Sequence, residues 1–363
     1  MKVLILAYAY KNLGDDLFIK VLANRYKEVH FFIANKNKFK DKDTRNIKFL
    51  SLPRYAYMYV IYRIKKDMLQ NPINKIKNKV DFMVLLGGSM FIENSTGKSE
   101  KKIQMEFNTV KKDYFILGCN FGPYKTLEYK ENYKNVLKNA KDVCFREKYS
   151  YNLFKDLENV RYASDIIFGL NTKKIKILKR KRVIISVIDV AQKFKAEYKQ
   201  PYEEQIITWT KEFASKGYEV ILMSFCKAEG DEEVIKNIMK NLQNMENVRT
   251  YYYRGNIQEA LAVIAESEIM IGTRFHANIL GFVFNKAVIP IIYSQKTLNV
   301  LEDIKFDGRY FKIEDMAKEK NLKITDADIN YRQDISQQVE DSKRMFEKLD
   351  EYIEKRMKNK EEF

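Results

Sequence analysis

Residues 268–284 read EIMIGTRFHANILGFVF, and this stretch decides the fold that we expect. The apolar run 268–271 predicts a short buried strand, and the apolar spacing over 277–284 predicts a helix. The turn Gly272–His276 joins the two. Such a turn presents backbone N–H groups at the positive end of a helix dipole, so the stretch predicts an α/β fold with an anion site at the turn.

The same strand–turn–helix pattern recurs along most of the chain. Near residue 90, Phe82–Leu86 reads as a strand and Gly87-Gly88-Ser89 as a turn whose glycines let the backbone approach a ligand. This alternation predicts parallel sheets that are covered on both faces. Strands are expected at 3–7, 29–33, 82–86, 114–117, 142–145, 160–162, 183–187, 218–223, 248–252, 268–271 and 288–292, and helices at 17–26, 101–111, 129–139, 149–157, 204–215, 232–241, 258–265, 277–284 and 298–304.

The alternation stops at the basic stretch Lys173–Arg182, which we interpret as a linker. The sequence therefore predicts two doubly wound, Rossmann-like α/β domains facing a cleft, residues 1–172 and 183–325. In such sheets, ligands bind beyond the carboxyl ends of the strands. Helical spacing over 326–363 predicts a closing helix, and the tyrosine-rich segment 55–64 is predicted to be a buried helix.

The composition limits the partners and the compartment. A formal net charge of +17 allows nucleic acid, an anionic membrane or acidic small molecules as partners. Most of the excess is scattered lysine rather than a basic patch, so we expect no nucleic-acid partner. The three cysteines form no C-x-x-C pair, which argues for a reducing compartment and against zinc. No apolar run reaches the roughly 18 residues of a membrane span. We expect a cytoplasmic protein whose only membrane contact is peripheral, at the inner face.

Charged side chains follow several of the strands predicted in the first half. Asp15 and Asp16 follow the first strand, where one aspartate can cap the next helix and the other is left for acid–base chemistry or a hydroxyl contact. Arg146 ends a later strand and can contact either a substrate or a carboxylate, Glu147 or another. Asp165 can contact a substrate, cap a turn or simply join the linker.

The densest set of candidate residues follows the last two strands. Arg274 offers a planar fork for phosphate or carboxylate, and Lys296 adds a second positive charge. His276 can act as an acid, a base or an anion donor near neutral pH. The chain has two histidines, and His30, inside a predicted strand, is interpreted as structural. These residues favour an enzyme that handles a small, highly anionic substrate between two domains.

At these positions the sequence resembles the polysaccharide pyruvyl transferases. That family shows an N-x-G-D-[DE] start, a glycine-rich turn, a G-x-x-x-G-P loop and an [ST]-x-R-x-H motif followed by P-x-[IV]-x-[IV]-x-Y-x-x-K. Ser89 stands where a third glycine is common, and Thr273 where serine is common. The matching segments are Asn12–Asp16, Gly87–Ser89, Gly118–Pro123, Arg146–Ser150, Ala163–Asp165, Thr273–His276 and Pro290–Lys296.

The resemblance implies a fold of the GT-B type, with the acceptor on the first domain and the donor, phosphoenolpyruvate, on the second. The implied product is a pyruvate ketal across two hydroxyls of a sugar, in a surface polysaccharide or its lipid-linked precursor. His276 is the implied acid or partner of the leaving phosphate, and Asp15, Asp16 and Glu93 are candidate bases. No metal or cofactor is expected, because basic side chains can neutralise the donor. The expected substrate-binding residues are Arg274, Lys296, Arg146, Asn12, Gly14, Gly87, Gly88, Ser89 and Asp165.

Two other functions stay open. A glycosyltransferase of the same fold would use a nucleotide sugar and would need a carboxylate for the ribose hydroxyls, which Glu229 or Asp231 can provide. A basic module without enzymatic activity would bind nucleic acid or anionic lipid, and its sign would be a cluster of arginine and aromatic residues, which the sequence does not contain.

Overall fold

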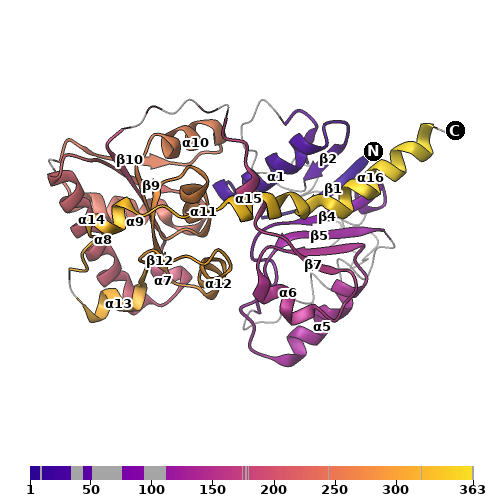
Figure 1. Cartoon of the computed structure of the whole chain (residues 1–363), viewed down its shortest axis with the longest axis horizontal. Helices are drawn as coiled ribbons and strands as arrows, with labels where there is room; N and C mark the ends of the chain where they lie inside the picture. The colour runs from indigo at the N-terminus through magenta and orange to yellow at the C-terminus, as the bar shows by residue number, and fades with distance from the viewer. Residues whose placement is uncertain are drawn as a thin grey trace, which may run out of the picture.

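A computed structural model of the chain describes residues 1–8, 10–33, 44–50, 76–93, 112–173, 175, 178, 180–243, 245–319 and 321–361. The helix expected over 101–111, the segment 55–64 and part of the expected linker lie outside these residues. Two α/β domains lie side by side, each built on one parallel sheet (Figure 1). The prediction of two doubly wound parallel sheets is therefore confirmed.

The first domain is built on a sheet in the order β3-β2-β1-β4-β5-β6-β7, in which every pairing is parallel. The central strands β4 and β5 are buried at every position, which explains why their sequences are continuously apolar. Only the short edge strand β3 was not expected. The strands are β1 (Lys2–Leu6), β2 (His30–Ile33), β3 (Ile47–Phe49), β4 (Phe82–Leu86), β5 (Tyr114–Cys119), β6 (Asp142–Phe145) and β7 (Val160–Tyr162).

The second domain repeats this plan in the order β10-β9-β8-β11-β12-β13, again with parallel pairings throughout. In both sheets the strand order reverses beside the first strand, at β1 and at β8, and ligands of doubly wound sheets bind at such points. The two-residue edge strand β13 was not expected. The strands are β8 (Arg182–Ser186), β9 (Glu219–Ser224), β10 (Val248–Tyr252), β11 (Ile269–Gly272), β12 (Ala287–Ile292) and β13 (Phe311–Lys312).

The helices that follow the motif-bearing strands begin earlier than expected. The side chain of Asn12 caps α1 by accepting a hydrogen bond from the Gly14 N–H at 3.1 Å, so neither Asp15 nor Asp16 is the cap. Both aspartates, like His276 in α11 and Lys296 in α12, therefore lie in the first turn of a helix. The helices of this part are α1 (Leu13–Arg25), α5 (Leu127–Lys138), α6 (Lys148–Phe154), α7 (Val190–Lys193), α8 (Lys199–Ser215), α9 (Asp231–Lys240), α10 (Ile257–Ala265), α11 (Phe275–Val283), α12 (Gln295–Asp303) and α13 (Ile313–Lys318).

The two domains share an apolar interface. Helix α1 of the first domain contacts α10 and α11 of the second, and their buried side chains belong to one continuous hydrophobic cluster. A backbone hydrogen bond from the Leu13 N–H to the Phe225 carbonyl crosses the same interface at 3.1 Å. The carboxyl ends of the two sheets are therefore held facing each other.

The C-terminal segment is not the single closing helix that was expected. It is divided into α14 (Asp326–Asn330), α15 (Ser336–Ser342), a 3₁₀ turn at Lys343–Phe346 and α16 (Glu347–Glu361). Figure 1 shows α16, in yellow, lying against the first domain. Asp350 of α16 accepts hydrogen bonds from Arg25 and Tyr26, and the ring of Tyr352 packs edge-on against Phe82 and Phe115. The last helix thus completes the core of the first domain.

Candidate active site

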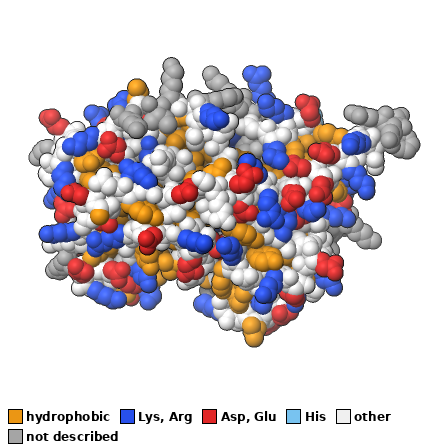
Figure 2. Space-filling view, in the orientation of Figure 1, with side chains coloured by type: hydrophobic (Ala, Val, Ile, Leu, Met, Phe, Trp, Pro, Cys, Tyr) orange, Lys and Arg blue, Asp and Glu red, His pale blue; other side chains and the backbone are white. Residues whose placement is uncertain are grey.

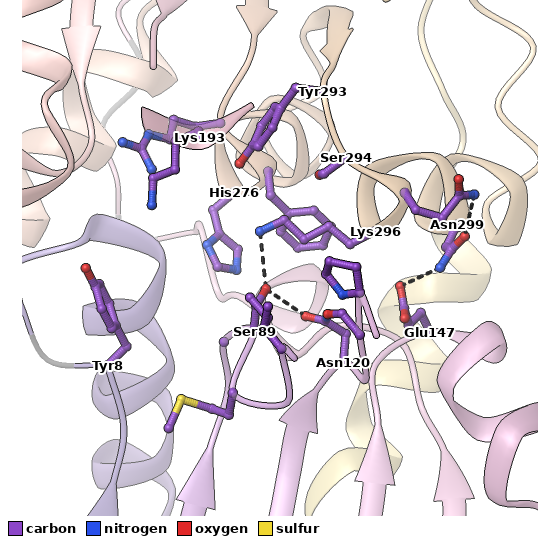
Figure 3. Close-up of a pocket in the computed structure, with 18 of the residues that line it drawn as sticks. Tyr8, Ser89, Asn120, Glu147, Lys193, His276, Tyr293, Ser294, Lys296 and Asn299 are labelled. Carbon is purple, nitrogen blue, oxygen red and sulfur yellow. Dashed lines mark hydrogen bonds between the residues drawn. The ribbon is translucent and has the colours of Figure 1, made fainter. Parts of the chain in front are cut away.

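A cavity of about 1000 Å³ lies where the carboxyl ends of the two sheets face each other. Its walls come from both domains, with Ser89 and Asn120 on one side and Tyr293 and Lys296 on the other (Figure 3). Of the residues expected to bind or transform a substrate, the cavity is lined by Asn12, Asp15, Gly88, Ser89, Arg146, Arg274, His276 and Lys296.

Two of the three candidate bases, and the expected substrate-binding residue Asp165, do not line the cavity. Asp16 is buried at the domain interface, where it accepts a hydrogen bond of 2.6 Å from the Tyr253 hydroxyl. Glu93 accepts hydrogen bonds from the backbone N–H and the hydroxyl of Thr126, at 2.9 and 2.7 Å, and so fixes the loop before α5. Asp15 is therefore the one candidate base of the three that faces the cavity.

Two glycines that were expected to bind substrate instead let side chains pack closely against the backbone. A Cβ on Gly14 would lie 1.7 Å from Nδ1 of His276, so only glycine lets the imidazole rest on α1. Gly87 has a φ of 64°, and a Cβ there would lie 2.5 Å from the ring of Phe18. Gly88 and Ser89, the next residues of the same turn, reach the cavity itself.

Arg146 lies at the centre of a buried polar cluster. One of its terminal nitrogens, Nη1, is 3.2 Å from Oδ2 of Asp165 and 3.2 Å from Nε2 of His276. The other, Nη2, donates to Oδ1 of Asn120 at 2.8 Å. The carboxylate partner is thus Asp165 and not Glu147, which accepts hydrogen bonds from Ser150 and Asn299 instead. The aromatic ring of Phe275 covers the guanidinium at 4.3 Å.

The contact with Arg146 fixes the protonation of His276. A guanidinium can only donate, so Nε2 of His276 is the acceptor and carries no proton. Burial, together with the charges of Arg146, Lys296 and Arg274, holds the pKa of His276 well below its usual range. In this arrangement the imidazole is neutral at pH 7.

Lys296 connects the second domain to this cluster. Its ammonium group donates to the Ser89 hydroxyl at 3.3 Å, and that hydroxyl donates to Oδ1 of Asn120 at 3.0 Å (Figure 3). Burial and the charge of Arg146 lower the pKa of Lys296 to about 8. Two cations are thereby held close together, an arrangement that a bound anion would stabilise.

Asp15 is a carboxyl that lines the cavity and titrates near neutral pH. Burial raises its pKa to about 7, although the charges of Arg146 and Lys296 oppose this shift. A carboxyl that titrates near neutral pH can accept or return a proton during one reaction cycle. Asp15 therefore has the properties of a general base or acid.

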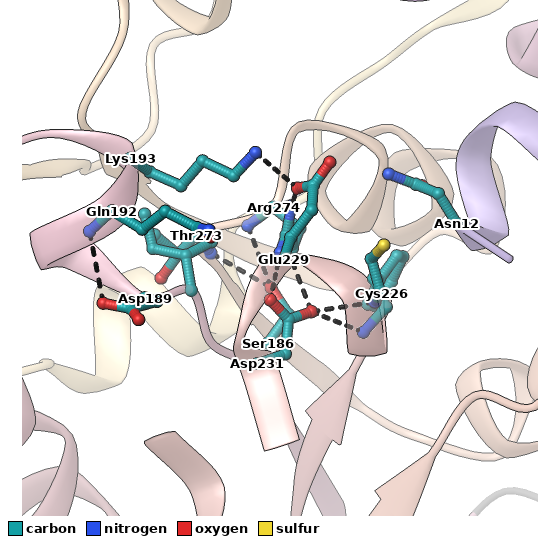
Figure 4. Close-up of polar contacts among 12 residues, drawn as sticks. Asn12, Ser186, Asp189, Gln192, Lys193, Cys226, Glu229, Asp231, Thr273 and Arg274 are labelled. Carbon is teal, nitrogen blue, oxygen red and sulfur yellow. Dashed lines mark hydrogen bonds and ion pairs between the residues drawn. The ribbon is translucent and has the colours of Figure 1, made fainter. Parts of the chain in front are cut away.

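Arg274 has a different environment from Arg146. Its guanidinium makes ion pairs with both Glu229 and Asp231 (Figure 4). Asp231 also accepts backbone hydrogen bonds from Phe225 and Cys226, each at 2.9 Å. Burial alone would raise the pKa of Glu229, but Arg274 and Lys193 lower it to about 2. The charge of Arg274 is thus fully matched by protein carboxylates.

Several polar lining residues, among them Asn120, Lys193 and Tyr293, were not among the candidate site residues. Asn120 lies in the matched loop Gly118–Pro123, and its place directly after a strand is the signal that could have found it. Tyr293 follows β12 and is the tyrosine of the last matched motif, whereas Lys193 ends the four-residue helix α7 and belongs to no recognisable pattern.

Two kinds of feature are absent from the described residues. In this part of the chain, no group of three or more His, Cys, Asp or Glu side chains lies close enough together to hold a metal ion. Among the same residues, no helix combines the length and the hydropathy needed to cross a membrane.

Comparison with known proteins shows to which family and which fold this chain is similar. The family model for polysaccharide pyruvyl transferases matches residues 12–295. The amylovoran biosynthesis protein AmsJ of Erwinia amylovora is 22% identical over 261 residues, which cover 66% of this chain. The match spans 62% of the length of that relative.

Similar solved structures come from proteins of low sequence identity. UDP-GlcNAc 2-epimerase of Methanocaldococcus jannaschii superposes with a TM-score of 0.53 at 9% identity, covering 96% of this chain and 99% of the epimerase. Anabaena Alr3699/HepE, solved with UDP-glucose, gives a TM-score of 0.51 at 12% identity, covering 86% of this chain and 85% of that protein. At these identities the two superpositions establish the shared two-domain fold, which is of the GT-B type.

Proposed function

This chain belongs to the polysaccharide pyruvyl transferase family, and we propose that it transfers pyruvate from phosphoenolpyruvate to two hydroxyls of one sugar, forming a ketal. The acceptor is a surface polysaccharide or its lipid-linked precursor. Phosphoenolpyruvate is a co-substrate, and the proposal uses no metal or cofactor. A net charge of +17 favours peripheral contact with an anionic membrane during this reaction.

The observation that carries the proposal is the pair of cations in the cavity, Arg146 and Lys296. Phosphoenolpyruvate bears a phosphate and a carboxylate on a three-carbon skeleton, so it can engage both cations at once. Burial, and after it the charge of Arg146, depresses the pKa of Lys296, so negative charge beside the two cations would stabilise the charged form of this lysine. The donor would supply that negative charge.

The roles expected for the two arginines are therefore revised. Arg274 is already paired with two carboxylates, whereas Arg146 shares its donors among one carboxylate, an imidazole and an amide. We assign donor binding to Arg146 and Lys296. Arg274 shapes the donor side of the cavity by holding Glu229 and Asp231.

The proton transfers that the reaction requires assign the remaining roles. The two acceptor hydroxyls lose two protons, of which one ends on the methylene carbon of the donor and the other on the departing phosphate. Asp15, ionised above its pKa of about 7, accepts a hydroxyl proton from the acceptor. His276, beside Arg146, serves the departing phosphate. Ser89 and Gly88 supply the acceptor side with a hydroxyl and a close approach of the backbone.

The competing functions find less support. A nucleotide-sugar enzyme would need Glu229 or Asp231 for the ribose, but both carboxylates are in ion pairs with Arg274. For a nucleic-acid module, a single basic patch would be needed, and in Figure 2 the lysines and arginines of the visible face alternate with acidic side chains.

Calorimetric titration of the protein with phosphoenolpyruvate and, separately, with UDP-sugars tests the proposal. We expect heat of binding and thermal stabilisation with phosphoenolpyruvate alone; a ligand at 100 times its Kd adds about 2.7 kcal/mol to stability. Binding of a UDP-sugar without binding of phosphoenolpyruvate would overturn it. Membrane contact is tested with anionic vesicles, where retention that survives high salt would contradict a peripheral, electrostatic attachment.

A further inference from the structure

Asp165 lies behind the cavity wall and is fully buried, with 0% of its surface exposed. Its Oδ1 accepts the backbone N–H of Ile167 at 3.0 Å, which fixes the carboxylate plane. Its Oδ2 is 3.2 Å from Nη1 of Arg146 and 3.9 Å from Nε2 of His276. Arg146 and His276 thus meet at the same carboxylate oxygen.

In this arrangement an N–H group of Arg146 lies where a proton on Nε2 of His276 would have to be. Nη1 donates to Nε2 at 3.2 Å, so the imidazole cannot donate to Asp165 at the same time. A phosphate or carboxylate oxygen is a stronger acceptor for a guanidinium than a neutral imidazole is. An anion that binds Arg146 in the cavity therefore competes with His276 for this N–H.

We infer that Asp165 is a positioning residue for His276: when an anionic donor engages Arg146, Nε2 of His276 takes up one proton from solvent and donates it as a hydrogen bond to Oδ2 of Asp165. The inference rests on the proposed function for the identity of the donor. It turns His276 from a hydrogen-bond acceptor into an acid only when the donor is present.

The charges around His276 favour this exchange. Burial opposes its protonation most; Arg146 and Lys296 add to this from two elements, and Arg274 does so from the start of its own helix. A donor that carries phosphate and carboxylate neutralises the first two charges. Asp165 and Asp15 are the acidic groups on the remaining sides, and Asp165 is the one within reach of Nε2.

The chain has two histidines, which makes the proton directly observable. Imidazole NMR signals are titrated with pH, with and without saturating phosphoenolpyruvate. Calorimetry in two buffers of different ionisation enthalpy then counts protons. We expect His276 to titrate at least one pH unit higher with the ligand, and proton uptake, of at most one proton per site, at pH values between its two midpoints. The exposed His30 serves as the internal control. Binding without uptake, and without a shift of the His276 signal, would overturn the inference.

The variant Asp165→Asn tests the carboxylate, because its amide oxygen can still accept the Ile167 N–H. We expect phosphoenolpyruvate to bind within about fivefold of the wild type, proton uptake to disappear and kcat to fall about 10²- to 10⁴-fold. Unchanged uptake in this variant would overturn the inference.

Asp142→Asn is the matched control. Asp142 is equally buried in the first domain and pairs with Arg161, outside the cavity lining. It should keep proton uptake, and loss of uptake there would overturn the assignment to Asp165. If phosphoenolpyruvate fails to bind the wild type, the proposed function fails by itself. Inorganic phosphate then replaces it as the probe, and phosphate binding without uptake overturns the present inference.

Discussion

Arg146 and Arg274 both follow a parallel strand, both are buried and both line the same cavity, but their partners differ. Arg274 faces two carboxylates, one of them anchored by two backbone N–H groups. Arg146 faces one carboxylate, a neutral imidazole and an amide. A buried arginine with matched charge supports architecture, whereas one with neutral partners retains attraction for an incoming anion. The comparison predicts that mutation of Arg274 lowers stability, whereas mutation of Arg146 weakens donor binding.

The largest effect should come from breaking the Arg274 cluster. Arg274→Ala leaves Asp231 without its cation and Glu229 with Lys193 alone, and should lower the free energy of unfolding by about 3–5 kcal/mol. Urea denaturation measures this. Adding Glu229→Gln and Asp231→Asn to Arg274→Met should restore most of the loss, because no buried carboxylate is then left unpaired and Lys193 is partly exposed. Stability within 1 kcal/mol of the wild type, together with lost donor binding, would make Arg274 the donor ligand after all.

A smaller effect, on binding rather than folding, is expected at Arg146. Arg146→Lys keeps a charge for Asp165 but loses the planar fork, so phosphoenolpyruvate should bind about 10- to 150-fold more weakly, or 1.5–3 kcal/mol. Calorimetry measures the Kd. Arg161→Lys, in the buried pair with Asp142, is the control and should bind the donor normally. Equal losses in the two variants would assign the effect to packing.

The pH dependence of activity tests whether the donor is bound by the positive charges of Arg146 and Lys296. Activity needs ionised Asp15, whose pKa is about 7, and charged Lys296, whose pKa is about 8. The logarithm of kcat/KM should therefore fall below pH 7 and again above pH 8, about tenfold per unit. Lys296→Arg should move the alkaline limb up by more than two units, since arginine stays charged. An unmoved limb would mean that another group titrates.

No effect on donor binding is expected at Asp16, which separates this residue from its neighbour Asp15. Burial raises the pKa of Asp16 to about 7, so its protonated form stabilises the fold below about pH 4 and this contribution is lost as pH rises through 7. Asp16→Asn should flatten the fall of stability over this window, by at most about 1.4 kcal/mol per pH unit, while donor binding stays unchanged. Denaturation at several pH values tests this, and an unaltered slope would contradict it.

The sequence predicts the strands well, because buried parallel strands such as Phe82–Leu86 are continuous apolar runs. It places helix starts less well, because a cap depends on one side-chain contact: Asn12 takes the role that Asp15 or Asp16 was expected to have. Eight of the residues that the sequence predicts for the site do line one cavity.

What the sequence cannot supply is the partner of each charge. Glu229 and Asp231 follow β9, far along the chain from Arg274, and only the packed sheet brings them together. Asp165 was expected either to touch substrate or to cap a turn; it caps the turn at Ile166–Gly169 and reaches the cavity only through Arg146 and His276. Such second contacts depend on tertiary distances that no local pattern encodes.

The return of α16 to the first domain has a consequence for dissecting the molecule. The chain crosses between the domains a second time, so a cut at residue 172 separates sequence halves but not folding units. A fragment of residues 1–172 would lack the side chains that cover Phe82 and Phe115. Supplying the 15-residue helix Glu347–Glu361 as a separate peptide should restore that cover, which makes α16 a natural site for fragment complementation.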